Sequence, residues 1–176
     1  MNISPETVLS FKKPTADFIC ADTGYKYFFV EFKIKNLDNN QILFEVKRPD
    51  GAIRWEDHDT KETEGRAIEY TFPKSFLDSK QIQTKLSFAV GPKEIKNLRM
   101  IERHYFDDKL LRSYDFQFGF CIPNTINTWE SLYELPELND STKREMMQRP
   151  KSTVSDSFYF IDNKLVLHNK AFYSYQ

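Results

Sequence analysis

Hydrophobic and polar residues alternate with a period of two over much of this chain, which is the pattern of strands that bury one face. Within residues 25–37, apolar side chains fall mainly at even positions and charged side chains at odd positions. Residues 41–47 repeat the alternation, and Asn39-Asn40 between the two runs is typical of a tight turn. We therefore predict a β-hairpin. The inward positions predicted for its second strand are Ile42, Phe44 and Val46.

Further strands follow the same alternation along the rest of the chain. Residues 105–111 and 160–166 each place a short Asp/Asn/Lys turn between apolar runs, which predicts two more hairpins. Strands at this spacing, without long helices between them, are typical of an antiparallel β-sandwich. Three other predicted strands have the inward sets Ile68, Tyr70 and Phe72; Leu86, Phe88 and Val90; and Tyr114, Phe116, Phe118 and Phe120.

Helical signals are confined to the connection between residues 123 and 155. Asn127 with Glu130, and Thr142 with Glu145, have the spacing of helix-capping pairs. We therefore predict a long crossover loop with one or two short helices, the second ending before Pro150. The first helix would carry Trp129, Leu132 and Tyr133 on one side.

Composition narrows the class of protein. The chain has 176 residues, which predicts one domain able to bury about 70% of its surface. Its formal net charge of −1 argues against binding nucleic acid or an anionic membrane through net charge. Aromatic residues make up 15% of the chain although hydrophobic residues total an ordinary 40%. Such rings either fill a sandwich core or wall a lipid cleft.

Cysteine usage and hydropathy point to a cytoplasmic protein. Cys20 and Cys121 lie far apart and have no metal or redox spacing. No apolar run reaches the length of a membrane span, and the first residues lack the pattern of a secretory signal. Residues 1–15 are expected to form an N-terminal arm, and residues 56–65 a mobile acidic loop.

An anomaly occurs in the predicted strand at residues 98–106. If Leu98 and Met100 face the core, the alternation places Glu102 and His104 on the same face. An unpaired polar group there costs several kcal/mol. Either a tyrosine hydroxyl, a bulge or a trapped water satisfies the pair, or the pair faces a cavity whose ligand has an apolar body and a polar end.

The sequence contains residue types that occur in enzyme and metal sites, but not in the spacing that such sites need. Cys121, His104 and Glu102 include the residue types of a thiol triad, but their spacing does not predict the required geometry. Residues 57–59, Asp-His-Asp, contain possible metal ligands without a second cluster. No glycine-rich phosphate loop is visible. We predict no catalytic residues, no metal and no cofactor.

Two long segments carry a family resemblance. Residues 98–123, which include Ile-Glu-Arg-His-Tyr-Phe, and residues 155–171, which begin Ser-Asp-Ser-Phe-Tyr-Phe, resemble the uncoordinated (retinal gene four) family. Members of this family are acyl-binding relatives of the GMP phosphodiesterase delta subunit. Weaker matches at residues 4–9, 32–34 and 43–46 extend the resemblance over nearly the whole chain.

The resemblance implies a single lipid-binding domain over residues 1–176, with an immunoglobulin-like β-sandwich whose sheets part to admit a client's N-terminal myristoyl group. It implies a trafficking chaperone that solubilises N-myristoylated proteins, such as G-protein alpha subunits or ciliary proteins. Release would follow binding of an Arf-like small GTPase in its GTP form. The implied location is the cytoplasm, with delivery to a cilium or flagellum, and no bond is made or broken.

Residue by residue, the resemblance implies a lipid pocket whose polar mouth is formed by Glu102 and His104, the pair that the alternation sets apart. This chain departs from the family at Tyr114 and Leu135, where the family favours phenylalanine, and the departure bears on pocket shape. The implied pocket wall consists of Phe32, Ile34, Tyr70, Phe76, Tyr114, Leu135, Tyr159 and Tyr173.

The polar mouth offers a way to distinguish acyl from prenyl clients. We hypothesise that Glu102 accepts the amide N–H at the acyl junction, while His104 with Tyr70 or Tyr159 orients the carbonyl. A prenyl thioether has no such amide. Two alternatives stay open, a prenyl-binding carrier of the same superfamily and a protein–protein adaptor with a filled core.

Overall fold

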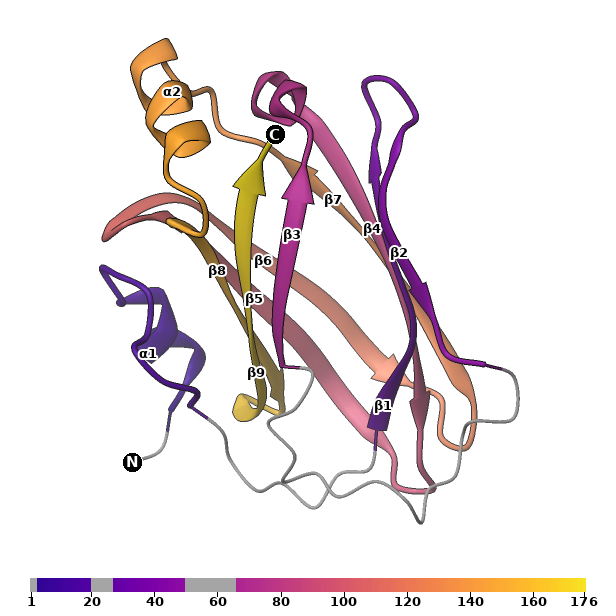
Figure 1. Ribbon diagram of the computed structural model, residues 1–176. Helices are drawn as coiled ribbons and strands as arrows, with labels where there is room; N and C mark the ends of the chain where they lie inside the picture. Colours follow the sequence, from indigo (N-terminus) through magenta and orange to yellow (C-terminus); the bar gives the residue numbers. More distant parts are fainter. Residues whose placement is uncertain (1–2, 20–26, 50–65) are drawn as a thin grey trace.

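Nine strands form two stacked sheets in the computed structural model, which describes residues 3–19, 27–49 and 66–176 (Figure 1). This confirms the predicted β-sandwich. All neighbouring strands are antiparallel except β3 and β9, which are parallel. The four-stranded sheet has the order β2 (Ile42–Lys47), β1 (Tyr27–Asn36), β4 (Gln81–Val90) and β7 (Ile126–Glu134). The five-stranded sheet has the order β3 (Ala67–Phe72), β9 (Lys164–Tyr175), β8 (Thr153–Ile161), β5 (Ile95–Phe106) and β6 (Lys109–Cys121).

The three predicted hairpins are confirmed as β1–β2, β5–β6 and β8–β9. Their turns contain residues with positive φ, namely Asn40 at 59°, Asp107 at 50°, and Asp162 and Asn163 at 48° and 62°. Asparagine and aspartate tolerate this left-handed conformation better than other residues with a Cβ atom, and they are typical of tight hairpin turns. The turn chemistry visible in the sequence therefore positions these strand pairs.

The predicted helix around Asn127 is wrong, because residues 126–134 form strand β7. Burial alternates strictly along β7, with Trp129 and Tyr133 buried and Leu132 49% exposed. A spacing of four places Trp129 and Tyr133 on one side of either a helix or a strand, so that pair could not distinguish the two. Pairing with β4 along the whole strand decides the outcome.

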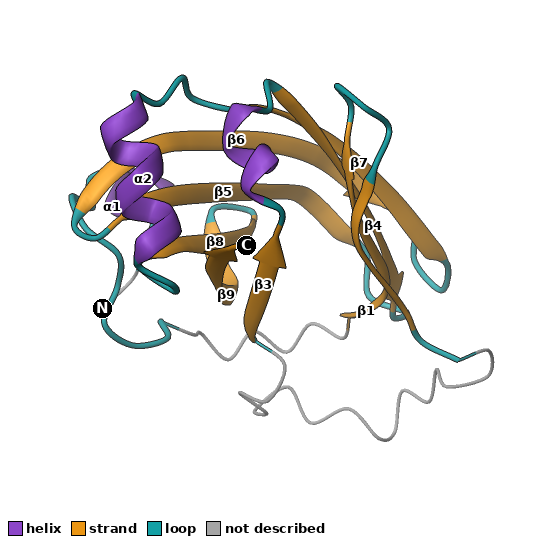
Figure 2. Cartoon of the chain, turned by 45° about the horizontal axis from the view of Figure 1, so that its top comes forward, coloured by secondary structure: helices purple, strands orange, loops and turns teal. Residues whose placement is uncertain are grey.

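The second predicted helix is confirmed as α2 (Asp140–Gln148). Its N-cap is Asn139, whose side chain accepts the backbone N–H of Thr142 at 2.8 Å, rather than the Thr142–Glu145 pair. Two short helices were not predicted, α1 (Pro5–Leu9) and the 3₁₀ helix η2 (Lys74–Asp78). Figure 2 shows η2 and α2 at the same end of the sandwich; we call this the helical end.

Three predicted inward positions are exposed. Phe120 is 52% exposed because Gly119, with a φ of 89°, lies at an irregularity of the β5–β6 ladder and reverses the alternation. Ile42 is 50% exposed because the β1–β2 register shifts beside it. Val46 lines the cavity between the sheets, as the predicted inward position requires, and is 52% exposed because β2 is an edge strand. Such irregularities follow from strand pairing and are not visible in the alternation.

The outer face of the five-stranded sheet carries a second, smaller hydrophobic core. Val8 of α1 is fully buried there, with the half-buried residues Phe11 and Ile19 nearby. Part of the predicted N-terminal arm therefore covers this face. The strand residues of this core are Ile101, Phe158, Phe160 and Leu165.

A buried polar network joins the same N-terminal segment to β8 and β9. The carboxylate of Asp156, which is 1% exposed, accepts hydrogen bonds from Lys170 Nζ at 2.6 Å and His168 Nε2 at 2.8 Å. It also accepts the backbone N–H of Thr15 at 3.0 Å. Nδ1 of His168 accepts the backbone N–H of Ile19 at 2.9 Å, so Nε2 carries the proton donated to the carboxylate. These bonds hold residues 15–19 against the sheet.

Candidate lipid-binding cavity

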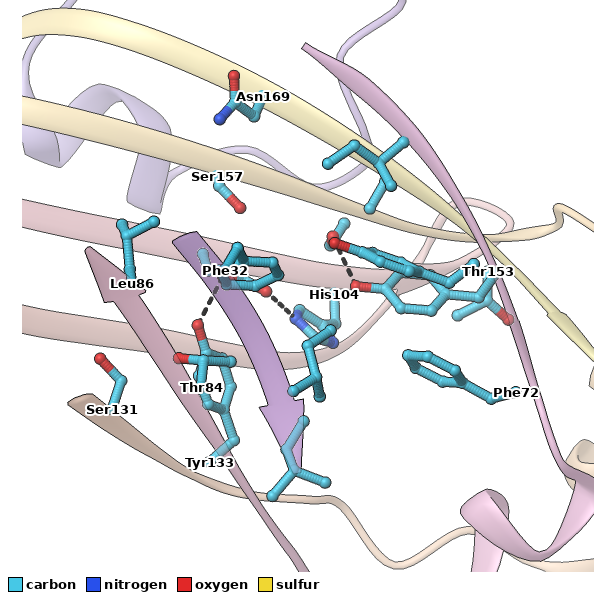
Figure 3. A pocket seen from close by; sticks show the side chains of 18 of the residues that line it. Phe32, Phe72, Thr84, Leu86, His104, Ser131, Tyr133, Thr153, Ser157 and Asn169 are labelled. Atoms are coloured by element: carbon cyan, nitrogen blue, oxygen red, sulfur yellow. Dashed lines mark hydrogen bonds and ion pairs between the residues drawn. The ribbon is translucent and has the colours of Figure 1, made fainter. Parts of the chain in front are cut away.

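A cavity of about 400 Å³ lies between the two sheets and is lined by residues from all nine strands (Figure 3). This volume falls within the range of small-molecule sites, roughly 300–1,000 Å³. At the helical end the lining includes half-buried apolar residues, Phe76, Leu135 and Leu138. Lining residues farther inside are buried, among them Met100 and Leu86. The sandwich is therefore not filled solidly with side chains.

Nine of the ten predicted site residues line this cavity. The exception is Tyr114, whose ring packs behind the wall, 5.2 Å from the ring of His104 and 4.7 Å from that of Tyr133. Its hydroxyl donates to the backbone carbonyl of Glu134 at 2.8 Å. Tyr114 therefore supports the wall. The nine lining residues are Phe32, Ile34, Tyr70, Phe76, Glu102, His104, Leu135, Tyr159 and Tyr173.

Glu102 and His104 face the interior, as the alternation predicts. Oε1 of Glu102 lies 2.5 Å from Nε2 of His104, and Oε2 accepts the hydroxyl of Tyr133 at 2.8 Å. Two features that the sequence left as alternatives therefore occur together, a tyrosine hydroxyl that satisfies the carboxylate and a cavity beside it. Each carboxylate oxygen keeps a lone pair for a ligand donor.

The tyrosines around Glu102 keep their protons. Burial is the main cause, and the charge of Glu102 adds to it, so the pKa values of Tyr70, Tyr133 and Tyr173 are all raised above their usual range. The hydroxyl of Tyr173 lies 3.1 Å from Oγ of Ser155. These hydroxyls are neutral hydrogen-bonding groups at physiological pH.

Hydroxyl and amide side chains lie on the cavity wall at the level of Glu102. Glu102 is paired across strands with Ser157, which is paired with Asn169. On the opposite sheet Thr84 is paired with Ser131, and Figure 3 shows these side chains on facing walls. We call Thr84, Glu102, His104, Ser131, Ser157 and Asn169 the polar belt.

The polar belt and the residues beyond it were largely missed from the sequence. Beyond the belt, away from the helical end, the walls are mainly apolar and include Phe29, Leu86, Met100 and Trp129. Arg48 also lines the cavity there and donates from Nε to the backbone carbonyl of Phe29 at 2.7 Å. Alternation in β7 could have revealed Trp129 and the belt residue Ser131, had that segment been read as a strand. Glu102 and Ser157 meet through long-range pairing, which has no local signal. The cavity can hold a hydrocarbon whose amide head lies at the belt.

The thiol-triad alternative is not supported by the geometry. Cys121 is fully buried, and burial raises its pKa to about 12. Along the β5–β6 ladder Cys121 pairs with Ile95, whereas His104 pairs with Arg112 near the other end. A buried protonated thiol far from the imidazole is not an activated nucleophile.

The described part of the chain contains neither a cluster of metal ligands nor a membrane-spanning helix. No three His, Cys, Asp or Glu side chains gather there as a metal site. The Asp-His-Asp segment at residues 57–59 and the predicted acidic loop at 56–65 lie outside the described residues. Among residues 3–19, 27–49 and 66–176, no helix has the length and hydropathy needed to cross a bilayer.

The fold and the cavity define a two-sheet sandwich of the lipid-binding class. The family model described as GMP-PDE, delta subunit, matches residues 22–175. The chain is 43% identical to protein unc-119 homolog B of Homo sapiens, covering 98% of this chain and 72% of that protein. It is 43% identical to unc-119 homolog B-A of Xenopus laevis (98% and 74% covered) and 41% identical to unc-119 of Caenorhabditis elegans (98% and 80% covered). The chain belongs to the unc-119 group of the GMP-PDE delta subunit family, whose members are binding and transport proteins.

Proposed function

We propose that this protein sequesters the N-terminal myristoyl group of client proteins between its two sheets and carries the clients through the cytoplasm. Clients of this kind include G-protein alpha subunits and ciliary proteins, and the cilium or flagellum is the proposed destination. The observation that carries the proposal is the mainly apolar cavity of about 400 Å³ with the buried carboxylate of Glu102 and its half-buried imidazole partner on the wall. Family membership supports the lipid-binding and trafficking part.

Hydrocarbon burial supplies the affinity. Each methylene removed from water contributes about 0.8 kcal/mol, so a myristoyl chain taken up whole contributes roughly 10 kcal/mol. A single myristoyl group binds a membrane only marginally, with a constant on the order of 10⁴ M⁻¹. A protein site in the nanomolar range, about −12 kcal/mol, therefore extracts the client from the membrane.

The polar belt supplies the selectivity. The carboxylate of Glu102 accepts the amide N–H at the acyl junction. It uses a lone pair that its hydrogen bonds to His104 and Tyr133 leave free. His104 and the hydroxyl of Tyr70 or Tyr159 orient the carbonyl. A prenyl thioether offers no amide hydrogen, so the same carboxylate stays unsatisfied when a prenyl chain enters.

Replacing Glu102 with alanine tests this role. We expect Glu102→Ala to weaken binding of a myristoylated glycine peptide by about 1–3 kcal/mol, because a buried charge-assisted hydrogen bond is lost. Fluorescence titration would compare this peptide with its unacylated twin and with a farnesylated peptide. The preference for the acyl over the farnesyl peptide should narrow in the variant.

The control is Tyr133→Phe, which removes one hydrogen bond to Glu102 and leaves the carboxylate in place. It should retain the acyl preference. Unchanged selectivity in Glu102→Ala would exclude the carboxylate as the selective group. Equal binding of acylated and unacylated peptides would instead favour the adaptor alternative, and tighter binding of the farnesyl peptide would favour the prenyl carrier.

Release requires a state with lower cargo affinity. An Arf-like GTPase in its GTP form that binds the empty protein more tightly than the loaded one lowers cargo affinity by that difference in binding free energy. Within the described sheets β2, β3, β6 and β7 are the edge strands, and an edge strand can pair with a strand of such a partner. Displacement of labelled acyl peptide by the GTP-bound but not the GDP-bound GTPase would support this step, and displacement by neither would contradict it.

A further inference from the structure

A second, much smaller cavity lies beyond the inner end of the main cavity. Its volume is about 20 Å³, and it shares Phe29, Leu86, Trp129 and Tyr159 with the lining of the main cavity. Its exposed surface is entirely apolar, so it offers no polar group to hold a water molecule. The rest of its lining is buried and consists of Phe88, Ile95, Leu98, Ile161 and Val166.

The rings of Phe29 and Tyr159 lie where the two cavities meet. Their centroids are 5.9 Å apart and their planes are inclined by 50°. Phe29 comes from β1 and Tyr159 from β8, so the pair spans the gap between the sheets. Both residues lie at irregularities of strand pairing, after Phe29 in the β1–β4 ladder and after Tyr159 in the β8–β9 ladder. Such bulges redirect side chains and are over-represented beside functional sites.

The strand register gives the distance from the polar belt to this ring pair. Moving along β8 away from the helical end, the inward residues after Ser157 are Tyr159 and then Ile161. At about 3.3 Å per residue, the ring pair lies roughly 7 Å from the belt and the small cavity roughly 13 Å from it. An extended myristoyl chain is about as long as a strand of five or six residues, roughly 17–20 Å. Such a chain therefore reaches the ring pair and bends within the main cavity.

We infer that Phe29 and Tyr159 form the stop that sets the longest acyl chain this protein accepts. This inference rests on the proposed function and adds to it the residues that limit the length of the bound acyl chain. Carbons beyond the capacity of the main cavity must displace these rings, and displacing rings in a close-packed interior is unfavourable. Without the Phe29 ring the two cavities become one, and each further methylene that enters tightens binding about fourfold.

The experiment is a titration of one glycine peptide carrying lauroyl, myristoyl, palmitoyl or stearoyl chains. For the unmodified protein, affinity should rise from lauroyl to myristoyl and gain nothing further with palmitoyl. For Phe29→Ala, palmitoyl should gain about fifteenfold relative to myristoyl, because two further methylenes enter. The matched control is Phe76→Ala, the same substitution at the half-buried helical end, which should change all four affinities by a similar factor.

The outcomes separate this inference from the proposed function. If the unmodified protein binds none of the acyl peptides, the proposed function fails. If it binds myristoyl peptide but Phe29→Ala changes every chain length equally, the stop is refuted and the carrier role stands. Should Phe29→Ala not fold, Phe29→Leu keeps an apolar side chain and should shift the preference in the same direction by a smaller factor. An unshifted preference in that folded variant overturns the inference.

Discussion

Ala171→Trp is expected to abolish binding of myristoylated peptide while leaving the sandwich folded. Ala171 lies on β9 and lines the cavity beside Ser155, so an indole at this position projects into the space for the acyl chain. If it excludes only about four methylenes, the loss is about 3 kcal/mol, more than 100-fold in affinity. Fluorescence titration with the labelled peptide measures the loss, and thermal unfolding reports the fold.

The matched control is the neighbouring residue. Phe172 follows Ala171 on β9, does not line the cavity and projects from the opposite face of the sheet. Phe172→Trp should therefore keep the affinity within a few-fold of the unmodified protein. Full binding by a folded Ala171→Trp would show that the acyl chain does not occupy this cavity.

Asp156→Ala is expected to cost about 3–5 kcal/mol of unfolding free energy, because the change leaves Lys170 buried without its partner. The carboxylate also holds Thr15, so the variant should free part of the N-terminal segment from the sheet. Urea unfolding at neutral pH measures the loss. The control is Asp115→Ala, which breaks an exposed ion pair to Arg99 and should cost less than about 1 kcal/mol.

The contribution of Asp156 should also depend on pH. Burial by itself raises its pKa, but hydrogen bonds from His168 and Lys170 and the charge of Lys170 outweigh burial and bring the pKa below its ordinary value of 3.8. A carboxylate with a lowered pKa in the folded state stabilises the fold above its unfolded-state pKa, and this contribution is lost as pH falls through the folded-state pKa. The stability gap between the unmodified protein and Asp156→Ala should therefore be full at neutral pH and shrink below about pH 4. A gap that persists undiminished in strong acid would contradict this account.

Local pattern predicted the sandwich and the inward position of Glu102 and His104, whereas the family resemblance implied the other pocket residues. The errors of the pattern arise where strand pairing, rather than neighbouring residues, decides the structure. The Asp107 and Asp162-Asn163 turns fold the chain through short-range conformational preferences that are visible in the sequence. The β7 segment was misread because a spacing of four fits both a strand and a helix. Phe120 was misplaced because the ladder irregularity at Gly119 depends on the partner strand. Tyr114, which the family resemblance assigned to the wall, does not line the cavity, and its ring packs against those of His104 and Tyr133.

The sequence by itself determined the period of the strands, the hairpin turns and the presence of Glu102 and His104 on an inward face, because each follows from neighbours along the chain. Only the tertiary structure decided which side chains and which cavity that inward face contacts. The cavity, the polar belt and the Phe29–Tyr159 pair are built from strands far apart in sequence. Strand order and register, which long-range hydrogen bonds and packing select, bring those residues together.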